Sequence, residues 1–562
     1  MSPQCAYLAI DVGTGSVRAG LFNGNGKKLA YHHQQIKTRH IKENHFEQSS
    51  NDIWTSTLEC VRNVVDMAKR DSLDDVFVAA IGVDATCSLV ACLDDDETSP
   101  LSVTHGENEE DDIYNVILWL DHRAVAEAAE INVSLDENVK EVRSHFGNVL
   151  SPENEPPKLL WLQKVMPHVI ESGVFFDLAD WMAFKFCGAK RVRSSCTVAC
   201  KWGWGSNRGE QGEWNCDFWE KIGLGVLCAN NFQKIGATIV QPGQPIGTLP
   251  LGLASELGLS QDCVIASPMI DAHAGALWTL GIDSHLIRQL APSFEERLSI
   301  IAGTSTCYIQ LSRSPVFVSG IWGPFRDAVL PGFHVTEGGQ SVTGKLLEHT
   351  IETHPCYATL VRRVGVENVY DVLAELTESV VRAGKEDPAS HVHCLDYHAG
   401  NRSPRADPTL KGSMIGLTLS CDEFDLAVKF RATIQALCYG ARHIVEKMKA
   451  AGHYITLVGA CGGLCKSRLF LVELADCLAL PIALSSEEDT VLLGGAILAK
   501  VAHADGDVGN HAPAIVREAE RMTGIRDVIL PNEKRFRYHN RKYEVYQKMY
   551  ADFISYRDVM LR

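Results

Sequence analysis

Residues 11–18, DVGTGSVR, carry the strongest structural signal in this 562-residue chain. An apolar run at residues 7–10 precedes them and predicts a buried strand, while residues 17–22 predict a returning strand. The two glycines supply the backbone freedom that a tight turn needs. Because no helix is expected directly after the turn, the segment differs from a P-loop or a dinucleotide fingerprint, which place phosphate at a helix N-terminus.

The polar side chains of this turn are suited to binding phosphate and a metal ion. Thr14, Ser16 and Arg18 alternate along the returning strand, so they share one face. Hydroxyls and backbone N–H groups of the turn, which includes Gly13, would hold phosphate, and Asp11, at the end of the buried strand, is placed to hold a hydrated Mg²⁺. A plain hairpin tip would also explain the glycines, so the segment alone leaves both interpretations open.

Two further glycine-rich turns strengthen the phosphate interpretation. Residues 300–309, IIAGTSTCYI, again predict a strand, a turn containing Gly303 and Thr304, and a returning strand. A third turn, residues 459–467, follows a predicted strand at 456–458 and opens a helix through residue 475; it contains Gly462, Gly463 and Ser467. Three such turns, spread over both halves of the chain, indicate a nucleotide held by two related domains.

Length and composition restrict the class of protein. A chain of 562 residues is too long for one ordinary core, so two domains with extensions are expected. The net charge of −17 argues against nucleic acid and against anionic membrane surfaces as partners. The 18 cysteines form no CxxC pairs, and no apolar run approaches a membrane span. We therefore expect reduced thiols in a cytoplasmic protein.

The segments between these motifs suggest the domain boundaries. We expect a first domain at residues 1–266, a second at 267–505 and a helical C-terminal extension at 506–562 that packs back onto the body. An acidic loop at 94–112 separates two strands of one sheet. The other expected elements of the first domain are a helix at 50–70, a strand at 76–83 that ends at Asp84, and the two separated strands at 88–93 and 116–120.

Taken together, these motifs resemble the FGGY family of carbohydrate kinases, from Asp11 to about residue 500 and in the family's order. The opening motif matches at the five residues named above, and residues 302–305 match the second phosphate motif. In the adenosine motif Leu464 stands where the family usually has a third glycine. The resemblance implies an α/β fold of two ribonuclease H-like domains, of the actin, hexokinase and Hsp70 superfamily, with an interdomain cleft for ATP and sugar.

Asp271 is the candidate catalytic base. It closes an apolar run that begins near residue 264, and a carboxylate at a strand end can accept the proton of an attacking hydroxyl. On position alone, Asp271 could equally cap a helix that begins near Ala272. The family resemblance favours the base, because the family keeps its catalytic aspartate at this place.

The sugar ligands are expected at strand ends of the first domain. Asp84 opens DATCSLV, which resembles the ribulokinase-like branch, and Lys201 occupies the place of a substrate lysine in that branch. Trp119 could pack on a carbon face of the sugar, or it could simply belong to the core. Asp121 could hydrogen-bond sugar hydroxyls, or it could cap a helix. Glu337 lies in an EGGQ element that in the family approaches the ketose.

The sequence therefore predicts an ATP- and Mg²⁺-dependent kinase that converts D-ribulose to D-ribulose 5-phosphate. Within the same class, L-ribulose, D-xylulose and ribitol remain alternative substrates. A non-catalytic sugar- or nucleotide-binding regulator is a second alternative, because a fold does not determine a function. The sequence leaves a homodimer open.

Overall fold

The computed structural model describes residues 4–70, 76–94, 99–105, 112–135, 140–188, 192–205, 212–504 and 511–561. Its contacts divide the chain into two compact units that are discontinuous in sequence. Unit 1 comprises Met1–His285, Leu311–Thr336 and Asp489–Gly524; unit 2 comprises Leu286–Gln310, Glu337–Glu488 and Ile525–Arg562. The units group residues differently from the continuous domains 1–266, 267–505 and 506–562, whose boundaries stay a prediction.

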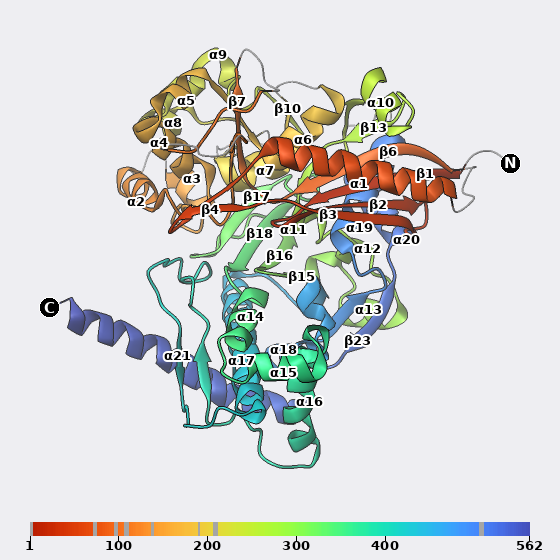
Figure 1. Ribbon diagram of the computed structural model, residues 1–562. Helices are drawn as coiled ribbons and strands as arrows, with labels where there is room; N and C mark the ends of the chain where they lie inside the picture. The colour runs from red at the N-terminus through yellow and green to blue at the C-terminus, as the bar shows by residue number, and fades with distance from the viewer. Residues whose placement is uncertain are drawn as a thin grey trace. The chain divides into compact units, whose positions relative to one another are not determined.

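Unit 1 is built on a mixed sheet in the order β12-β13-β6-β1-β2-β3, with β14 also paired to β6. Figure 1 labels β13, β6, β1, β2 and β3 of this sheet. A second sheet has the order β4-β5-β8-β7-β9, and β10 pairs with β11. The strands are β1 (Gln4–Val12), β2 (Ser16–Asn23), β3 (Lys28–Gln35), β4 (Arg39–Lys42), β5 (His45–Gln48), β6 (Val76–Ala85), β7 (Leu89–Leu93), β8 (Val116–Ile117), β9 (Gly173–Asp177), β10 (Val192–Ser194), β11 (Thr238–Val240), β12 (Pro245–Thr248), β13 (Val264–Ala266), β14 (Met269–Ile270) and β17 (Trp322–Arg326).

Helices cover both faces of the main sheet. The helical segments of unit 1 are α1 (Ser50–Arg70), α2 (Val125–Ser134), α3 (Lys140–His145), α4 (Glu155–Val165), α5 (Pro167–Ser172), α6 (Leu178–Cys187), α7 (Ser195–Thr197), the π-helix η1 (Val198–Trp202), α8 (Cys216–Lys221), η2 (Gly225–Cys228), α9 (Ala229–Phe232), α10 (Leu251–Leu257), α11 (Asp271–Ala274), α12 (Trp278–Gly281), α19 (Thr490–Ala504) and α20 (Ala512–Met522).

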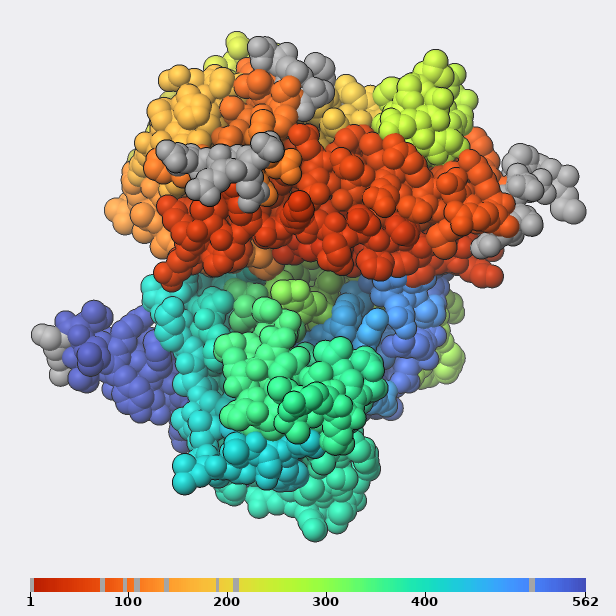
Figure 2. All heavy atoms as spheres, viewed as in Figure 1, coloured from red at the N-terminus to blue at the C-terminus, as the bar shows by residue number. Residues whose placement is uncertain are grey.

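The faces are assigned by the alternation of side chains along β1. Leu8 and Ile10 belong to the same apolar core as Ile53, Val61 and other buried residues of α1. The orange-red spheres of the segment that contains α1 form the front surface of this unit in Figure 2. Ala9, which points the other way, lies against Gly495 of α19. Asp11 has the parity of Ala9, so its carboxylate belongs to the α19 face.

Helix α19 packs on the sheet backbone to backbone. A Cβ atom at Gly82 of β6 would lie 1.9 Å from the carbonyl oxygen of Gly495, so neither strand nor helix could keep its place if a side chain were added. Although α19 follows nearly all of unit 2 in sequence, it is part of the core of unit 1.

Unit 2 contains a sheet in the order β18-β16-β15-β21-β22-β23 and a hairpin of β19 and β20. Its strands are β15 (Arg297–Ala302), β16 (Thr306–Ser312), β18 (His334–Gln340), β19 (His393–Leu395), β20 (Ser413–Ile415), β21 (Leu457–Cys461), β22 (Ile482–Ser485) and β23 (Ile525–Ile529). β16 ends, and β18 begins, among residues assigned to unit 1.

The helical segments of unit 2 are α13 (His285–Leu290), which starts at the last residue of a unit 1 segment, η3 (Phe294–Glu296), α14 (Gly344–Glu352), α15 (Tyr357–Val364), η4 (Val366–Asn368), α16 (Val369–Arg382), α17 (Glu423–Ala451), η5 (Gly463–Lys466), α18 (Arg468–Leu478) and α21 (Glu533–Met560). The long helix α17 is capped before its first residue by Asp422, whose side chain accepts a hydrogen bond from Asp425 N, and after its last residue by Gly452, whose φ is 118°. α21 packs on α17, α18 and β19.

Many of the expected elements are confirmed. The strand–turn–strand segments at 7–22 and 300–309 are antiparallel hairpins, and the helix at 50–70 has the predicted bounds. The strands at 88–93 and 116–120 are β7 and the shorter β8, which pair in one sheet. The C-terminal extension is helical and packs on the body, but it also contributes β23 to the edge of a sheet. Residues 95–98 and 106–111 of the predicted acidic loop lie outside the described residues.

One expectation about the cysteines is wrong. Cys216 and Cys228 are joined in a disulfide, with their Cα atoms 5.8 Å apart. The expectation of reduced thiols therefore fails for this pair. The physical reason is local: α8 and η2 fold back on each other, so cysteines separated by 12 positions in sequence become neighbours.

Candidate active site

Strand register brings three aspartates to one edge of the unit 1 sheet. β1 and β6 are parallel, and Asp11 is paired with Asp84. β14 is parallel to β6, with Met269 paired with Asp84, and Asp271 follows directly as the first residue of α11. Because the carboxyl ends of parallel strands meet at the same edge, the three carboxylates converge on a place where α/β sheets commonly bind ligands.

The three carboxylates have different environments. Asp11 and Asp84 are fully buried, whereas Asp271 is partly exposed. The guanidinium of Arg18 lies 2.8 Å from Asp11 Oδ2. Burial raises the pKa of Asp11 to about 6 although Arg18 opposes the shift, and burial followed by the charges of Asp11 and Asp271 raises the pKa of Asp84 well above its usual range.

This acidic cluster has too little positive charge of its own. Asp84 shares a side-chain hydrogen bond with Asp11, and Asp11 is paired with the guanidinium of Arg18. Two adjacent buried carboxylates are costly unless a cation balances them or one of them takes up a proton. Carboxylate oxygens are the ligands that a hydrated Mg²⁺ prefers, so Asp11 and Asp84 fit such an ion.

The first glycine turn is braced from several sides. Gly13 N donates to Ser16 O at 2.9 Å, and a Cβ atom at Gly13 would lie 2.7 Å from a terminal nitrogen of Arg18. Gln48 donates from its amide to Thr14 O at 2.8 Å. Trp119 Nε1 donates to Thr14 Oγ1 at 3.1 Å, so this predicted sugar ligand is placed directly beside the phosphate turn. Space around Gly15 is open within 4 Å.

Lys201 is held in a buried, charged neighbourhood of unit 1. It belongs to the π-helix η1, a form found most often at functional sites, and only 2% of it is exposed. Its ammonium lies 4.3 Å from the ring centroid of Trp322. Burial raises the pKa of Glu155, and the charges of Lys158 and then Lys201 oppose that shift. Glu155 also pairs with the buried Lys158 at 3.3 Å. Sequence reasoning missed this pair, because nothing local in the helix α4 marks it as buried.

Asp121 does not have the environment expected of a sugar ligand. Its carboxylate is fully buried and accepts hydrogen bonds from Phe46 N at 2.6 Å and from the backbone and guanidinium of Arg123. Arg123 in turn pairs with Glu47 at 2.9 Å. These contacts satisfy both oxygens of Asp121, so the structure favours the structural alternative for this residue.

In unit 2, the second and third glycine turns are neighbours. β15 and β21 are parallel with Ile301 paired with Cys461, which brings the turns that follow them together. A Cβ atom at Gly462, whose φ is 94°, would lie 2.4 Å from Ala302 O, so only glycine fits. Around Gly463 the space is open within 4 Å.

The other predicted residues of unit 2 lie in ordinary turn, cap and strand positions. In the second turn, Gly303 N donates to Ser305 O at 2.8 Å, and Thr304 O accepts from Thr343 N at 2.9 Å. Ser467 caps α18, because its side chain accepts from Phe470 N. Glu337 lies on β18 and is 5% exposed.

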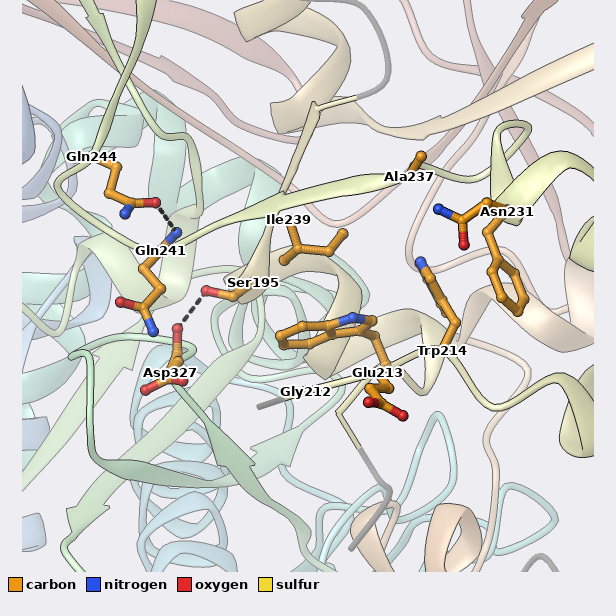
Figure 3. Close-up of a pocket in the computed structure, with 12 residues that line it drawn as sticks. Ser195, Gly212, Glu213, Trp214, Asn231, Ala237, Ile239, Gln241, Gln244 and Asp327 are labelled. Atoms are coloured by element: carbon orange, nitrogen blue, oxygen red, sulfur yellow. Dashed lines mark hydrogen bonds between the residues drawn. The ribbon is translucent and has the colours of Figure 1, made fainter. Parts of the chain in front are cut away.

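A separate cavity of about 620 Å³ in unit 1 contains none of the predicted site residues. Figure 3 shows Trp214 and Asn231 at one side, and Ser195 donating to Asp327 O at the other. Asn231 and Asp327 have left-handed backbone conformations. This cavity is thus distinct from the aspartate cluster.

Comparison with known proteins identifies the family. The model of the FGGY family of carbohydrate kinases, N-terminal domain, matches residues 6–277, and the C-terminal model matches residues 298–503. The chain belongs to the FGGY family of carbohydrate kinases. This match confirms the resemblance. The chain is therefore a sugar phosphotransferase, and enzymes of this family use a sugar and ATP as substrates.

Named relatives and solved structures agree with this assignment. This kinase is 39% identical to the FGGY carbohydrate kinase domain-containing protein of Homo sapiens, over 99% of the chain and 98% of the relative. It is 36% identical to a protein of Saccharomyces cerevisiae named D-ribulokinase, over 89% of the chain and 72% of the relative. The xylulose kinase of Rhodospirillum rubrum shares the fold, with a TM-score of 0.73 at 19% identity over 98% of this chain and 99% of that one.

The described part of this kinase contains no helix with the length and apolarity needed to cross a bilayer.

The environment of Asp121 gives a prediction. Asp121→Asn should lower the free energy of unfolding by roughly 3 kcal/mol, because it weakens the partner of a buried arginine. Thermal unfolding followed by circular dichroism measures this change, with the exposed Asp66→Asn of α1 as the control. The folded variant should keep the KM of the wild type for the sugar. An unchanged melting temperature together with a raised sugar KM would instead return Asp121 to the sugar site.

Proposed function

We propose that this kinase transfers the γ-phosphoryl group of ATP to the 5-hydroxyl of D-ribulose, with Asp271 as the general base. The role of Asp271 as the base is supported mainly by the strand register, which brings this partly exposed aspartate beside the buried Asp11 and Asp84. The sugar is proposed from the substrate-site motifs and from the relative named D-ribulokinase.

The base must reach the hydroxyl that attacks. Asp271 begins α11 at the edge of the sheet, and its Oδ1 accepts a hydrogen bond from Ala272 N at 2.6 Å. That contact orients the carboxylate, whose partly exposed position allows a substrate to approach. Asp271 then accepts the proton of the sugar hydroxyl as its oxygen attacks the γ-phosphorus. The alternative is that Asp271 only caps a helix and takes no part in proton transfer.

Asp11 and Asp84 are proposed to hold Mg²⁺ through its water shell. Bound there, Mg²⁺ would neutralise charge on the transferring phosphoryl group. The buried position of Asp84 beside Asp11 favours this role over the direct sugar contact expected from the sequence. Arg18 balances part of the charge of the two acids and keeps the pair compatible with folding.

The nucleotide ligands are proposed from the three turns. In unit 1 these are Gly13, Thr14 and Ser16, whose hydroxyls and N–H groups can donate to phosphate. In unit 2 they are Gly303, Thr304, Gly462 and Gly463, with open space at Gly463 for a ligand. Ser467 is proposed only as the residue that starts α18 beside this site, because its side chain is used as a cap.

The sugar ligands are proposed as Lys201, Trp119 and Glu337. Lys201 can donate to the ketose carbonyl, and the carboxylate of Glu337 can accept from hydroxyls. Trp119 is fixed by its hydrogen bond to Thr14, so its ring can pack on a carbon face of the sugar. L-Ribulose, D-xylulose and ribitol are the alternative substrates, and a non-catalytic regulator would bind sugar without ADP release.

Asp271→Asn should lower kcat by about 10²–10⁴-fold, because it preserves the size of the side chain but removes its ability to accept a proton. The KM for ATP should change little. Steady-state assays of ADP release on the folded, purified variant measure both quantities. Turnover close to that of the wild type would mean that Asp271 is not the base.

The choice of sugar is tested by ADP release with D-ribulose, L-ribulose, D-xylulose, ribitol and glycerol. We expect D-ribulose to give the highest kcat/KM and glycerol to be very poor, because a site that leaves polar groups unpaired rejects the wrong sugar strongly. Lys201→Met should reduce activity on D-ribulose more than on ribitol, which has no carbonyl to accept from the ammonium.

Lys185→Met is the matched control for this variant, because Lys185 also lies over tryptophan rings, at 5.1 Å from Trp54, but on α6. It should leave the ratio of ribulose to ribitol activity unchanged. A higher kcat/KM for D-xylulose or glycerol would overturn the sugar assignment and leave the kinase assignment intact.

A further inference from the structure

A buried cysteine contacts the chain on both sides of Asp271. Cys196 Sγ accepts a hydrogen bond from Ile270 N at 3.5 Å and lies 3.1 Å from His273 Nδ1. Ile270 precedes Asp271 and His273 follows it by two residues, and none of the three contacting residues is more than 3% exposed. We propose that Cys196 is a positioning residue that fixes the segment carrying Asp271. The proposal rests on the proposed role of Asp271 as the base.

The segment that carries Asp271 has little regular structure of its own. β14 has two residues and α11 has four, and no side chain caps the start of α11 at Ile270. The single turn of α11 is closed by a hydrogen bond from Gly275 N to Asp271 O at 2.8 Å. A contact from outside the segment is therefore needed to hold the carboxylate in one place, since catalysis tolerates little displacement of a reacting group.

Cys196 is itself firmly anchored. Its N–H donates to Ser194 Oγ at 3.2 Å, and Ser194 N donates to Asp180 Oδ1 at 2.8 Å. The second oxygen of Asp180 accepts from Thr197 Oγ1 at 2.6 Å. Asp180 belongs to α6, so the position of the sulfur is set by a helix of the unit 1 core. A continuous series of hydrogen bonds thus links that core to the base.

A second thiol completes the cluster. Cys200 Sγ lies 3.9 Å from the same Nδ1 of His273. Burial disfavours the thiolate of Cys196, but hydrogen bonding with Cys200 and the charge and hydrogen bond of His273 outweigh it and lower the pKa of Cys196 to about 6. A sulfur with thiolate character is a better acceptor for both of its donors. Because Lys201 follows Cys200 in η1, the cluster also links the proposed sugar lysine to the base.

The first test is a double-mutant cycle. Cys196→Ala should lower kcat by about 10–100-fold with the KM for ATP little changed, because it displaces the base without touching the nucleotide. Cys196→Ser should recover part of the loss, since its hydroxyl can still contact Ile270 N and His273. In the Asp271→Asn background, Cys196→Ala should cost little more, because the group that it positions no longer accepts a proton.

Cys263→Ala is the matched control. Cys263 is also a fully buried thiol of unit 1 and lies immediately before β13. It is not one of the residues of the proposed site. The second test is amide hydrogen exchange of residues 268–277. Exchange should be faster in Cys196→Ala than in the wild type, should be close to the wild-type rate in Cys196→Ser, and should be unchanged in Cys263→Ala.

The outcomes separate the two proposals. An equal loss of kcat on adding Cys196→Ala to the wild type and to Asp271→Asn, or unchanged exchange at 268–277, would overturn the positioning role. If Asp271→Asn retains wild-type turnover, the proposed base is wrong, and the exchange measurement alone then decides whether Cys196 fixes the segment. If Cys196→Ala does not fold, Cys196→Val, which also lacks a hydrogen-bond acceptor, is compared with Cys263→Val by the same exchange measurement; equal exchange at 268–277 in both would overturn the proposal.

Discussion

The parallel pairing of β1, β6 and β14 is the constraint on which the rest of unit 1 depends. It sets Asp11 opposite Asp84 and places Asp271 one step beyond them. A shift of one residue in either pairing would turn a carboxylate to the opposite face of the sheet, into the apolar core under α1. Leu8, Ile10 and their neighbours on that face hold the register because they are buried in the core. The packing of the core therefore also fixes the positions of the three aspartates.

On the face of the sheet that bears the acids, α19 meets β6 at two glycines, so no side chain separates the two backbones. Gly82 and Gly495 allow the backbones of β6 and α19 to touch, and a Cβ atom at Gly495 would lie 3.2 Å from Asp84 Oδ2. The helix therefore closes over the buried end of the cluster and excludes water from Asp84. Taking two carboxylates out of water costs several kcal/mol per ion before pairing. Arg18 offsets part of that cost, and the proposed Mg²⁺ would offset more of it.

Local signals explain why the sequence predicted so much of this arrangement. The glycine turns, the strand before Asp11 and the helix at 50–70 depend on residues within a few positions of one another, so their patterns are visible without a fold. The helix is a clear case: Ile53, Val61 and Val64 recur at helical spacing on its buried face, with Asp52 in the first turn and Lys69 in the last.

The features that the sequence did not reveal depend on distant partners. Asp121 was expected at the sugar, but Phe46 N, 75 positions away, already donates to it. Cys196 contacts Ile270 N over 74 positions. The discontinuity of the units has the same origin, because α19 returns to unit 1 after most of unit 2 has been completed. No pattern within one segment marks such a contact.

A crystal structure of the kinase with Mg²⁺, a non-hydrolysable ATP analogue and D-ribulose would decide these site assignments. We expect an ion held through water by Asp11 and Asp84, and a sugar whose 5-hydroxyl oxygen lies within about 2.6–3.2 Å of the Asp271 carboxylate. An ordered sugar with its 5-hydroxyl directed away from Asp271, or an ion bound away from Asp11 and Asp84, would contradict these assignments.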